Sequence, residues 1–311
     1  RGFFTGDKYT ALLIQSAHAN GATTFTDSGP GFTRTEFNGT DEYAIKTAIN
    51  GNWQSSDTQG TIIAWVKHDT IAGDDTVFAS ADTSAATTYI KFQTAAGKIS
   101  IEQRNGTTPT TVDEIQGNVA ITAGLWNCLA WQSTGTGYKL YVNGVAETTV
   151  VQTGVDAGDW FADTSTVARD NISIGARVIN SVTDYFDGEI AQVAVWGGAA
   201  DSVGVLTAAE ILAIHDLGPG ANLTTSYATD DHGMVGYWTF GNNNSGTNAD
   251  VAGTIFDEST GSDDDLSSST LAAPFAGHTI TSSGDPTHSA AQSVFGGSAI
   301  HFDGTGDYLT L

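Results

Sequence analysis

The sequence predicts an all-β protein built from antiparallel strands, and three observations support this. Short runs rich in β-branched and aromatic residues recur along the chain, as at 61–67 and 126–132. Several of these runs alternate apolar and polar residues and are joined by tight turns such as Asn143-Gly144. Apolar residues recur at helical spacing in only one short stretch, which follows Thr207. Together these features favour two stacked sheets.

A near-repeat organises the chain. Residues 36–44 return with few changes as 301–309, and each copy places aromatic residues around an Asn-Gly or Asp-Gly pair. This pattern predicts the first β-hairpin of a sheet. A repeated opening predicts a repeated domain, so we expect a first domain at 1–217, a linker at 218–230 and the opening part of a second copy at 231–311.

The strands of the first domain follow from apolar runs and alternation. We expect them at 9–15, 23–27, 61–67, 89–93, 99–103, 126–132, 138–142, 171–175 and 186–196. The last strand is apolar on both faces, with Ile190, Ala194 and Trp196 on one and Ala191, Val193 and Val195 on the other. The residues expected in the core between the sheets are Trp65, Phe92, Leu140 and Ile190.

One helix is predicted after the last strand. Thr207 and Glu210 have the spacing of a capping box, apolar residues follow, and Gly218 before a proline ends the pattern. The segment 218–233 is rich in turn-forming residues.

The second copy repeats the opening strands in the same order, because 255–261 resembles 25–29. Half a sandwich would leave apolar side chains in water. We therefore expect 231–311 to continue beyond the printed sequence or to be completed by a neighbouring copy. Folding back onto the first domain is the third outcome.

The charge of the chain excludes some partners. Acidic residues number 35 against 11 basic ones, a formal charge of -24, which argues against binding nucleic acid or anionic membranes. Cys128 lies in an apolar run and is expected to be buried. No stretch of about 18 apolar residues is present, so no membrane insertion is expected.

The order of motifs resembles one family. The motifs are 37–43, 61–67, 124–130, 140–144, 174–175, 186–190 and 206–211. In this order they resemble the laminin G-like, concanavalin A-like jelly rolls. The lead-in residues look like those of modules in phage virion and bacterial surface proteins.

The family includes lectins, receptors, enzymes and scaffolds, and for this chain we expect an extracellular, non-enzymatic module. The first hypothesis is an adhesion or structural protein of a phage virion surface (decoration or fibre), with a bacterial adhesin next. Such a protein would contact neighbouring copies, in a homo-oligomeric or repetitive assembly, or other surface proteins. The alternative is a carbohydrate-binding, lectin-like module of a secreted or cell-surface protein. No catalytic residue is predicted, because the run of carboxylates that the family's hydrolases carry on one strand is missing. The nearest acidic cluster, Asp156, Asp159 and Asp163, lies in a turn-rich loop.

Four aromatic residues in predicted loops are candidates for stacking on sugars: Trp53, Trp160, Phe161 and Tyr185. An indole or phenol ring offers an apolar face together with a polar tip. The alternative for each is packing within the core.

Calcium is the cofactor that the resemblance implies, with Asp27 and Asp257 at the family's first ligand position. The last strand has Ala191 where the family has a second aspartate. The alternative role for Asp27 is to cap a turn. The run 263–265 of three aspartates is expected to be a solvated loop.

Overall fold

The structure is a computed structural model that describes residues 32–49, 53, 57–106, 112–164, 169–198, 204–225, 233–240, 253–259, 264–272, 275–276, 281–289 and 299–310. The chain divides into two compact units. The larger unit, Arg34–Pro274, is the sandwich. The smaller unit contains the described residues from Phe275 onwards.

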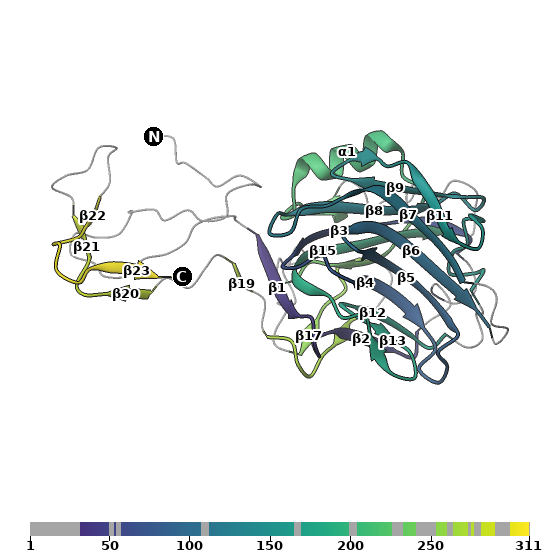
Figure 1. The fold of residues 1–311 in the computed structure, drawn as a ribbon, viewed down its shortest axis with the longest axis horizontal. Helices are drawn as coiled ribbons and strands as arrows, with labels where there is room; N and C mark the ends of the chain where they lie inside the picture. Colours follow the sequence, from purple (N-terminus) through teal and green to yellow (C-terminus); the bar gives the residue numbers. More distant parts are fainter. Residues whose placement is uncertain are drawn as a thin grey trace. The chain divides into compact units, whose positions relative to one another are not determined.

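One layer of the sandwich is a sheet with the strand order β10-β9-β8-β3-β15-β1, and β16 also pairs with β15 (Figure 1). Its strands are β1 (Thr33–Asn38), β3 (Gln59–His68), β8 (Asn127–Ser133), β9 (Tyr138–Val142), β10 (Val145–Ala146), β15 (Asp187–Gly198) and β16 (Met234–Trp238). These pairs are antiparallel, as predicted. β3 lies between β8 and β15, which confirms it as a central strand.

The other layer has the order β11-β7-β6-β5-β4-β12-β2-β18-β17. Its strands are β2 (Ala44–Thr47), β4 (Asp74–Ala81), β5 (Thr88–Ala95), β6 (Lys98–Asn105), β7 (Val112–Ala120), β11 (Thr149–Thr153), β12 (Asn171–Ile174), β17 (Thr254–Ile255) and β18 (Leu266–Ser267). A short pair, β13 (Arg177–Val178) and β14 (Val182–Thr183), follows β12.

The predicted Asn143-Gly144 turn is confirmed, and a second hairpin has a turn of the same kind. Asn143 and Gly144 have φ of 51° and 77° between β9 and β10, and Ala96 and Gly97 have φ of 47° and 73° between β5 and β6. Positive φ at both central residues is the two-residue turn whose twist matches antiparallel strands.

The hairpin predicted at 36–44 is wrong. β1 pairs with β15 in one sheet, whereas β2 pairs with β12 in the other, so the chain crosses between layers at Gly39. A sequence of two short strands around a glycine has the same local pattern in either arrangement. Only the distant partner strands distinguish a hairpin from a crossover.

The turn itself is the same in both copies of the repeat. Asn38 Oδ1 accepts the backbone N–H of Thr40 at 2.9 Å, and Asp303 Oδ1 accepts that of Thr305 at 2.7 Å. The glycine between them has φ of 67° in the first copy and 84° in the second. Such side-chain acceptors stabilise the turn locally. The sequence repeat is thus also a repeat of backbone structure.

Three of the predicted core residues lie between the sheets: Phe92, Leu140 and Ile190. Trp65 is buried elsewhere. Its indole stacks on His215 of α1 (Ala208–Leu217), with ring centroids 5.6 Å apart. Side chains alternate along a strand, and Trp65 points to the side of β3 that the helix covers.

A β-bulge between Ile190 and Gln192 changes the predicted faces of β15. The extra residue shifts the alternation, so Ile190 lies in the core with Val193 and Val195 instead of sharing a face with Ala194. Both faces are nevertheless covered, as predicted.

The helix agrees with its prediction. Thr207 Oγ1 accepts the backbone N–H of Glu210, and the carboxylate of Glu210 accepts the N–H of Thr207 at 2.6 Å. Gly218, with φ of 84°, caps the other end. A short 3-10 turn, η2 (Leu223–Thr225), follows.

Residues 234–271, the closing segment, complete the sandwich. β16 pairs with β15, while β18 joins β17 to β2 through Ser267 opposite Ile45. Its residues in the core are Trp238, Phe240, Ile255, Leu266 and Leu271.

This arrangement differs from the predicted division at 218–230. The described residues of 234–271, expected in a second domain, pack within the sandwich. Folding back is therefore the outcome that the structure shows for them, and burial of their apolar side chains favours it. Their counterparts in 9–27 lie outside the described residues.

The smaller unit contains β19 (Phe275–Ala276) and two strand pairs: β20 (Thr281–Ser283) with β23 (Tyr308–Thr310), and β21 (Thr287–Ser289) with β22 (Ala299–His301). Phe302 is 46% exposed, whereas its counterpart Phe37 is fully buried. A second sandwich built on this unit remains a prediction.

Asp264 anchors the closing segment. Its carboxylate is fully buried, accepts the indole N–H of Trp53 at 2.7 Å and lies 3.5 Å from the ammonium of Lys46. Its backbone carbonyl accepts the indole N–H of Trp238 at 3.0 Å. The prediction of a solvated loop is wrong for this residue, because its charge pairs with groups far away in sequence.

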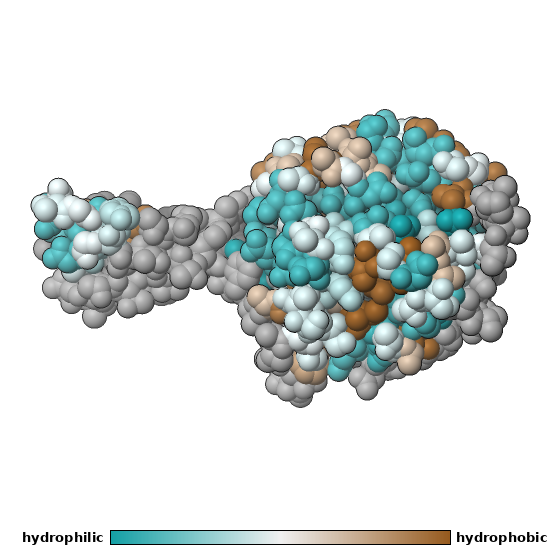
Figure 2. All heavy atoms as spheres, turned by 60° about the horizontal axis from the view of Figure 1, so that its bottom comes forward, coloured by the Kyte–Doolittle hydropathy of each residue, from teal (hydrophilic) through white to brown (hydrophobic). Residues whose placement is uncertain are grey.

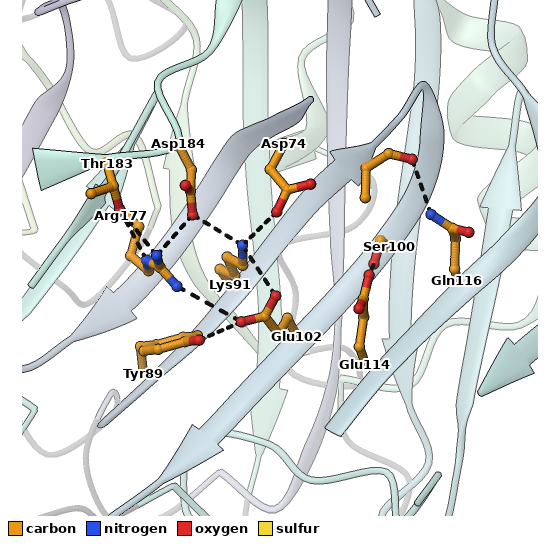
Figure 3. A network of polar contacts seen from close by, with 11 residues as sticks. Asp74, Tyr89, Lys91, Ser100, Glu102, Glu114, Gln116, Arg177, Thr183 and Asp184 are labelled. Atoms are coloured by element: carbon orange, nitrogen blue, oxygen red, sulfur yellow. Dashed lines mark hydrogen bonds and ion pairs between the residues drawn. The ribbon is translucent and has the colours of Figure 1, made fainter. Parts of the chain in front are cut away.

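An ion-pair network covers part of the outer face of the second sheet (Figure 3). The ammonium of Lys91, 2% exposed, lies 3.2 Å from Asp74, 3.2 Å from Glu102 and 3.0 Å from Asp184. Arg177 also pairs with Asp184, at 3.1 Å. The carboxylates that Figure 3 groups around Lys91 are therefore engaged in ion pairs.

Asp264→Ala should lower the free energy of unfolding by about 3–5 kcal/mol, because it leaves Lys46 and the indole of Trp53 without their buried partner. Urea denaturation followed by tryptophan fluorescence measures this. Asp216→Ala, at a carboxylate 66% exposed, is the control and should change stability by less than about 0.5 kcal/mol. A similar small loss for Asp264→Ala would contradict its role as an anchor.

Lys91→Met should also destabilise the sandwich by about 3–5 kcal/mol at neutral pH, since three carboxylates would lose their shared cation. Urea unfolding curves of both proteins at neutral pH test this, and a loss below about 1 kcal/mol would contradict it.

Candidate functional site

A surface hollow of about 310 Å³ lies where the closing segment meets β2. It is lined by Tyr43, Ile45, Ser267, Ser268 and Ser269. Figure 2 turns the lower edge of Figure 1, where β2, β12 and β17 lie, toward the viewer. Hydrophilic side chains cover most of the sandwich on this face, and apolar residues form a patch near its centre and smaller groups toward its margins.

Two tyrosines form the aromatic part of the site. The rings of Tyr43 and Tyr185 have centroids 6.3 Å apart and planes inclined by 59°. Both residues are partly exposed. Partial burial and the nearby Tyr43 and Asp41 raise the pKa of the Tyr185 hydroxyl, so it remains a neutral donor at physiological pH.

Alternation of the extended chain positions Tyr43, which directly precedes β2, and Ile45 within the strand. Ala44, between them, packs into the core, so its neighbours face outward. The Asn38 turn fixes the entry into this strand, because Asn38 Oδ1 also accepts the backbone N–H of Asp41 at 3.1 Å. The strand and the turn thus set the tyrosine at the rim of the sheet.

Serines of the closing segment form the opposite wall. Ser267 donates its hydroxyl to the carbonyl of Ile45 at 3.2 Å, and Ser268 Oγ accepts the backbone N–H of Thr270 at 3.2 Å. Thr270 in turn donates to the carbonyl of Asp41 at 3.2 Å. Short side chains leave space beside the tyrosine ring, and Ser269 is exposed there.

This arrangement suits a sugar ring. The apolar face of a pyranose can pack on a phenol ring, while sugar hydroxyls pair with tyrosine and serine hydroxyls. The carboxylate of Asp41 adds an exposed acceptor. These groups bind and orient a ligand.

Of the four aromatic residues predicted to stack on sugars, Tyr185 alone lies near this site: its ring contacts Tyr43, which lines the hollow, although Tyr185 itself does not line it. Trp53, Trp160 and Phe161 are fully buried in the core cluster. Trp53 and Phe161 have centroids 5.3 Å apart, and Phe161 also contacts Trp160 at 5.0 Å. For these three the core-packing alternative applies, because buried rings cannot present a face to a ligand.

The calcium site that the resemblance implies stays a prediction. Asp27 lies outside the described residues. Asp257 Oδ1 accepts the backbone N–H of Tyr237 and of Ser259, each at 2.9 Å. An aspartate that binds the N–H two residues ahead is a turn cap, the role weighed for Asp27. Ala191 has no side-chain oxygen that could serve as the family's second ligand in β15.

In the described part of the chain, one group of carboxylates is close enough to share a cation: Asp285, Asp303 and Asp307, within 4.8 Å. Asp307 accepts the backbone N–H of Asp285 and of Asp303, each at 2.8 Å, and these bonds lower its pKa. Hydrogen bonds of the turn therefore account for the cluster.

The other acidic loop is structural. Asp156 accepts the backbone N–H of Tyr138 at 2.8 Å, and Asp163 accepts that of Trp160 at 2.9 Å. The carbonyl of Asp159 accepts the Tyr138 hydroxyl at 2.6 Å. These contacts hold the loop against the sheet.

Sequence reasoning missed Tyr43 and the serines as site residues. Tyr43 belongs to the repeated stretch, which predicts a strand but no binding role. The serines at 267–269 follow the aspartates at 263–265 and match no binding motif. Contacts that span more than 200 residues bring the two together. The one available signal was a tyrosine on the outward face of a short strand.

Comparison with known proteins supports the fold. No curated protein matches the chain. The carbohydrate-binding module CBM40 of the Ruminococcus gnavus IT-sialidase, bound to alpha2,3 sialyllactose, is similar at 18% identity, covers 58% of this chain and 97% of its own, and has a TM-score of 0.47. A candidate carbohydrate-binding protein from Bacteroides ovatus ATCC 8483 shares 16% identity over 79% of this chain and 62% of its own, with a TM-score of 0.50.

At such identities the likeness concerns the fold alone. The family model is more specific: it describes the concanavalin A-like lectin/glucanases superfamily and matches residues 16–211, well over half of the chain. The strand order and the antiparallel sheets agree with it. The chain therefore belongs to the concanavalin A-like lectin/glucanase superfamily.

Proposed function

We propose that the sandwich is an extracellular glycan-binding module that binds without cleaving, with the hollow beside Tyr43 and Tyr185 as its sugar site. The observation that carries the proposal is the pairing of two partly exposed phenol rings with a wall of serine hydroxyls. In the described residues no helix is long and apolar enough to cross a membrane.

The absence of cleavage is part of the proposal. Glycoside hydrolysis needs a carboxylic acid and a second carboxylate on either side of the scissile bond. The lining residues of the hollow offer hydroxyls and an isoleucine. On the outer sheet face, Glu102 is held by Lys91 and accepts the hydroxyl of Tyr89. Mass spectrometry of a bound glycan after prolonged incubation should show it intact.

A role in a repetitive surface assembly, on a virion or a cell, is the second proposal. The repeat carries it, since the turn at Asn38 recurs with the same hydrogen bond at Asp303. Repeated modules suit adhesive arrays. Glycan binding and assembly are compatible, because a sugar site in each copy of an array would act multivalently.

Tyr185→Ala should weaken glycan binding about tenfold, because it removes a stacking face and a hydroxyl. Binding is measured by calorimetry with a glycan selected on an array. Tyr308→Ala is the matched control: Tyr308 is the repeat counterpart of Tyr43 and is 54% exposed in the smaller unit. It should leave the affinity unchanged. An equal loss in both variants, or no retention of any glycan, would contradict the proposed site.

A further inference from the structure

The hollow contains no positively charged side chain among its lining residues. Lys46 is next to Ile45 on β2, but consecutive residues of a strand face opposite sides. Its ammonium lies 3.5 Å from Asp264 on the buried side. A ligand carboxylate in the hollow would therefore meet hydroxyls without a cation.

The rim carries negative charge instead. Asp41 is exposed, and in the described residues its carboxylate has one side-chain partner, the neutral amide of Asn38 at 2.8 Å. Glu42 follows directly, and burial together with the charges of Asp41 and Glu36 raises its pKa. Asp184, beside Tyr185, differs because its charge is shared with Lys91 and Arg177.

We propose that the hollow selects against anionic sugars, so that it binds neutral glycans and, more tightly, protonated amino sugars in preference to sialylated ones. This rests on the proposed glycan-binding function and names the class of sugar. Like charges in a shared site repel, whereas an ammonium beside Asp41 gains a charge-assisted hydrogen bond. The selectivity thus opposes the sialyllactose binding of the Ruminococcus gnavus module.

The charge of the whole chain, -24, also repels anions, and the experiment must separate it from the local effect. Salt screens charges farther apart than about 10 Å at about 0.1 M ionic strength. Removing one negative charge changes the net charge of the chain by the same amount at any position, so two such variants differ only in their local effect. Asp41→Asn keeps the acceptor for Asn38 and removes the rim charge, while Asp216→Asn removes an exposed charge from α1.

The test measures binding of the full chain to matched pairs of glycans. The first pair is lactose and sialyllactose. The second is chitotriose and its fully deacetylated form, at about pH 6, below the ordinary pKa of amines. The array that tests the proposed function supplies further neutral and sialylated pairs. Affinities are compared at about 0.05 M and about 0.5 M salt.

We expect the sialylated member to bind about tenfold more weakly than its neutral partner, and the deacetylated trimer to bind several-fold more tightly than chitotriose at low salt. Asp41→Asn should reduce both affinity ratios, neutral over sialylated and deacetylated over acetylated, at least about threefold. Asp216→Asn should leave both ratios unchanged. Sialylated members that bind as well as neutral ones would overturn the selectivity and leave glycan binding intact. Ratios that do not respond to Asp41→Asn would also overturn it. No binding by any pair would overturn both proposals.

Discussion

The sandwich depends on one buried carboxylate. Asp264 brings together Trp53, Lys46 and, through its backbone carbonyl, Trp238. A buried charge is tolerated only when it is paired and hydrogen-bonded, so this set of partners specifies where the closing segment docks. Trp238 then packs against Phe78 with ring centroids 5.9 Å apart. The apolar core supplies most of the stabilisation, and the polar contacts at Asp264 select one arrangement of it.

The same docking builds the candidate site. Tyr43 directly precedes β2 and Ile45 lies within it, whereas the serines come from the closing segment, so neither part forms the hollow alone. Ser267 and Thr270 bond to the backbone of the 41–45 stretch, which links the two walls directly. In the proposed function, ligand binding and closure of the sandwich are coupled, because a sugar that contacted both walls would stabilise the closed form by its binding free energy.

Local chemistry was predictable from the sequence, and long-range pairing was not. The capping box at Thr207 and the Asn143-Gly144 turn depend on residues a few positions apart, and the structure confirms both. The crossover between β1 and β2, the bulge in β15 and the anchoring role of Asp264 depend on partners more than 100 residues away. Three of the four predicted sugar-stacking residues failed for the same reason. Aromatic residues in loops look alike in sequence whether a distant segment covers them or leaves them exposed.

The two copies of the repeat show what the shared sequence does encode. Both make the same turn, although Phe37 is fully buried and Phe302 is 46% exposed. The turn therefore follows from its own hydrogen bonds and does not require the sandwich around it. Burial and the proposed site need more than the repeat: the candidate site at Tyr43 also requires the serines and Tyr185, which the repeated stretch does not contain. The repeated motif thus specifies the local backbone geometry of the turn in both copies. Whether a candidate site forms beside the turn depends on other segments, such as the closing segment that supplies the serines beside Tyr43.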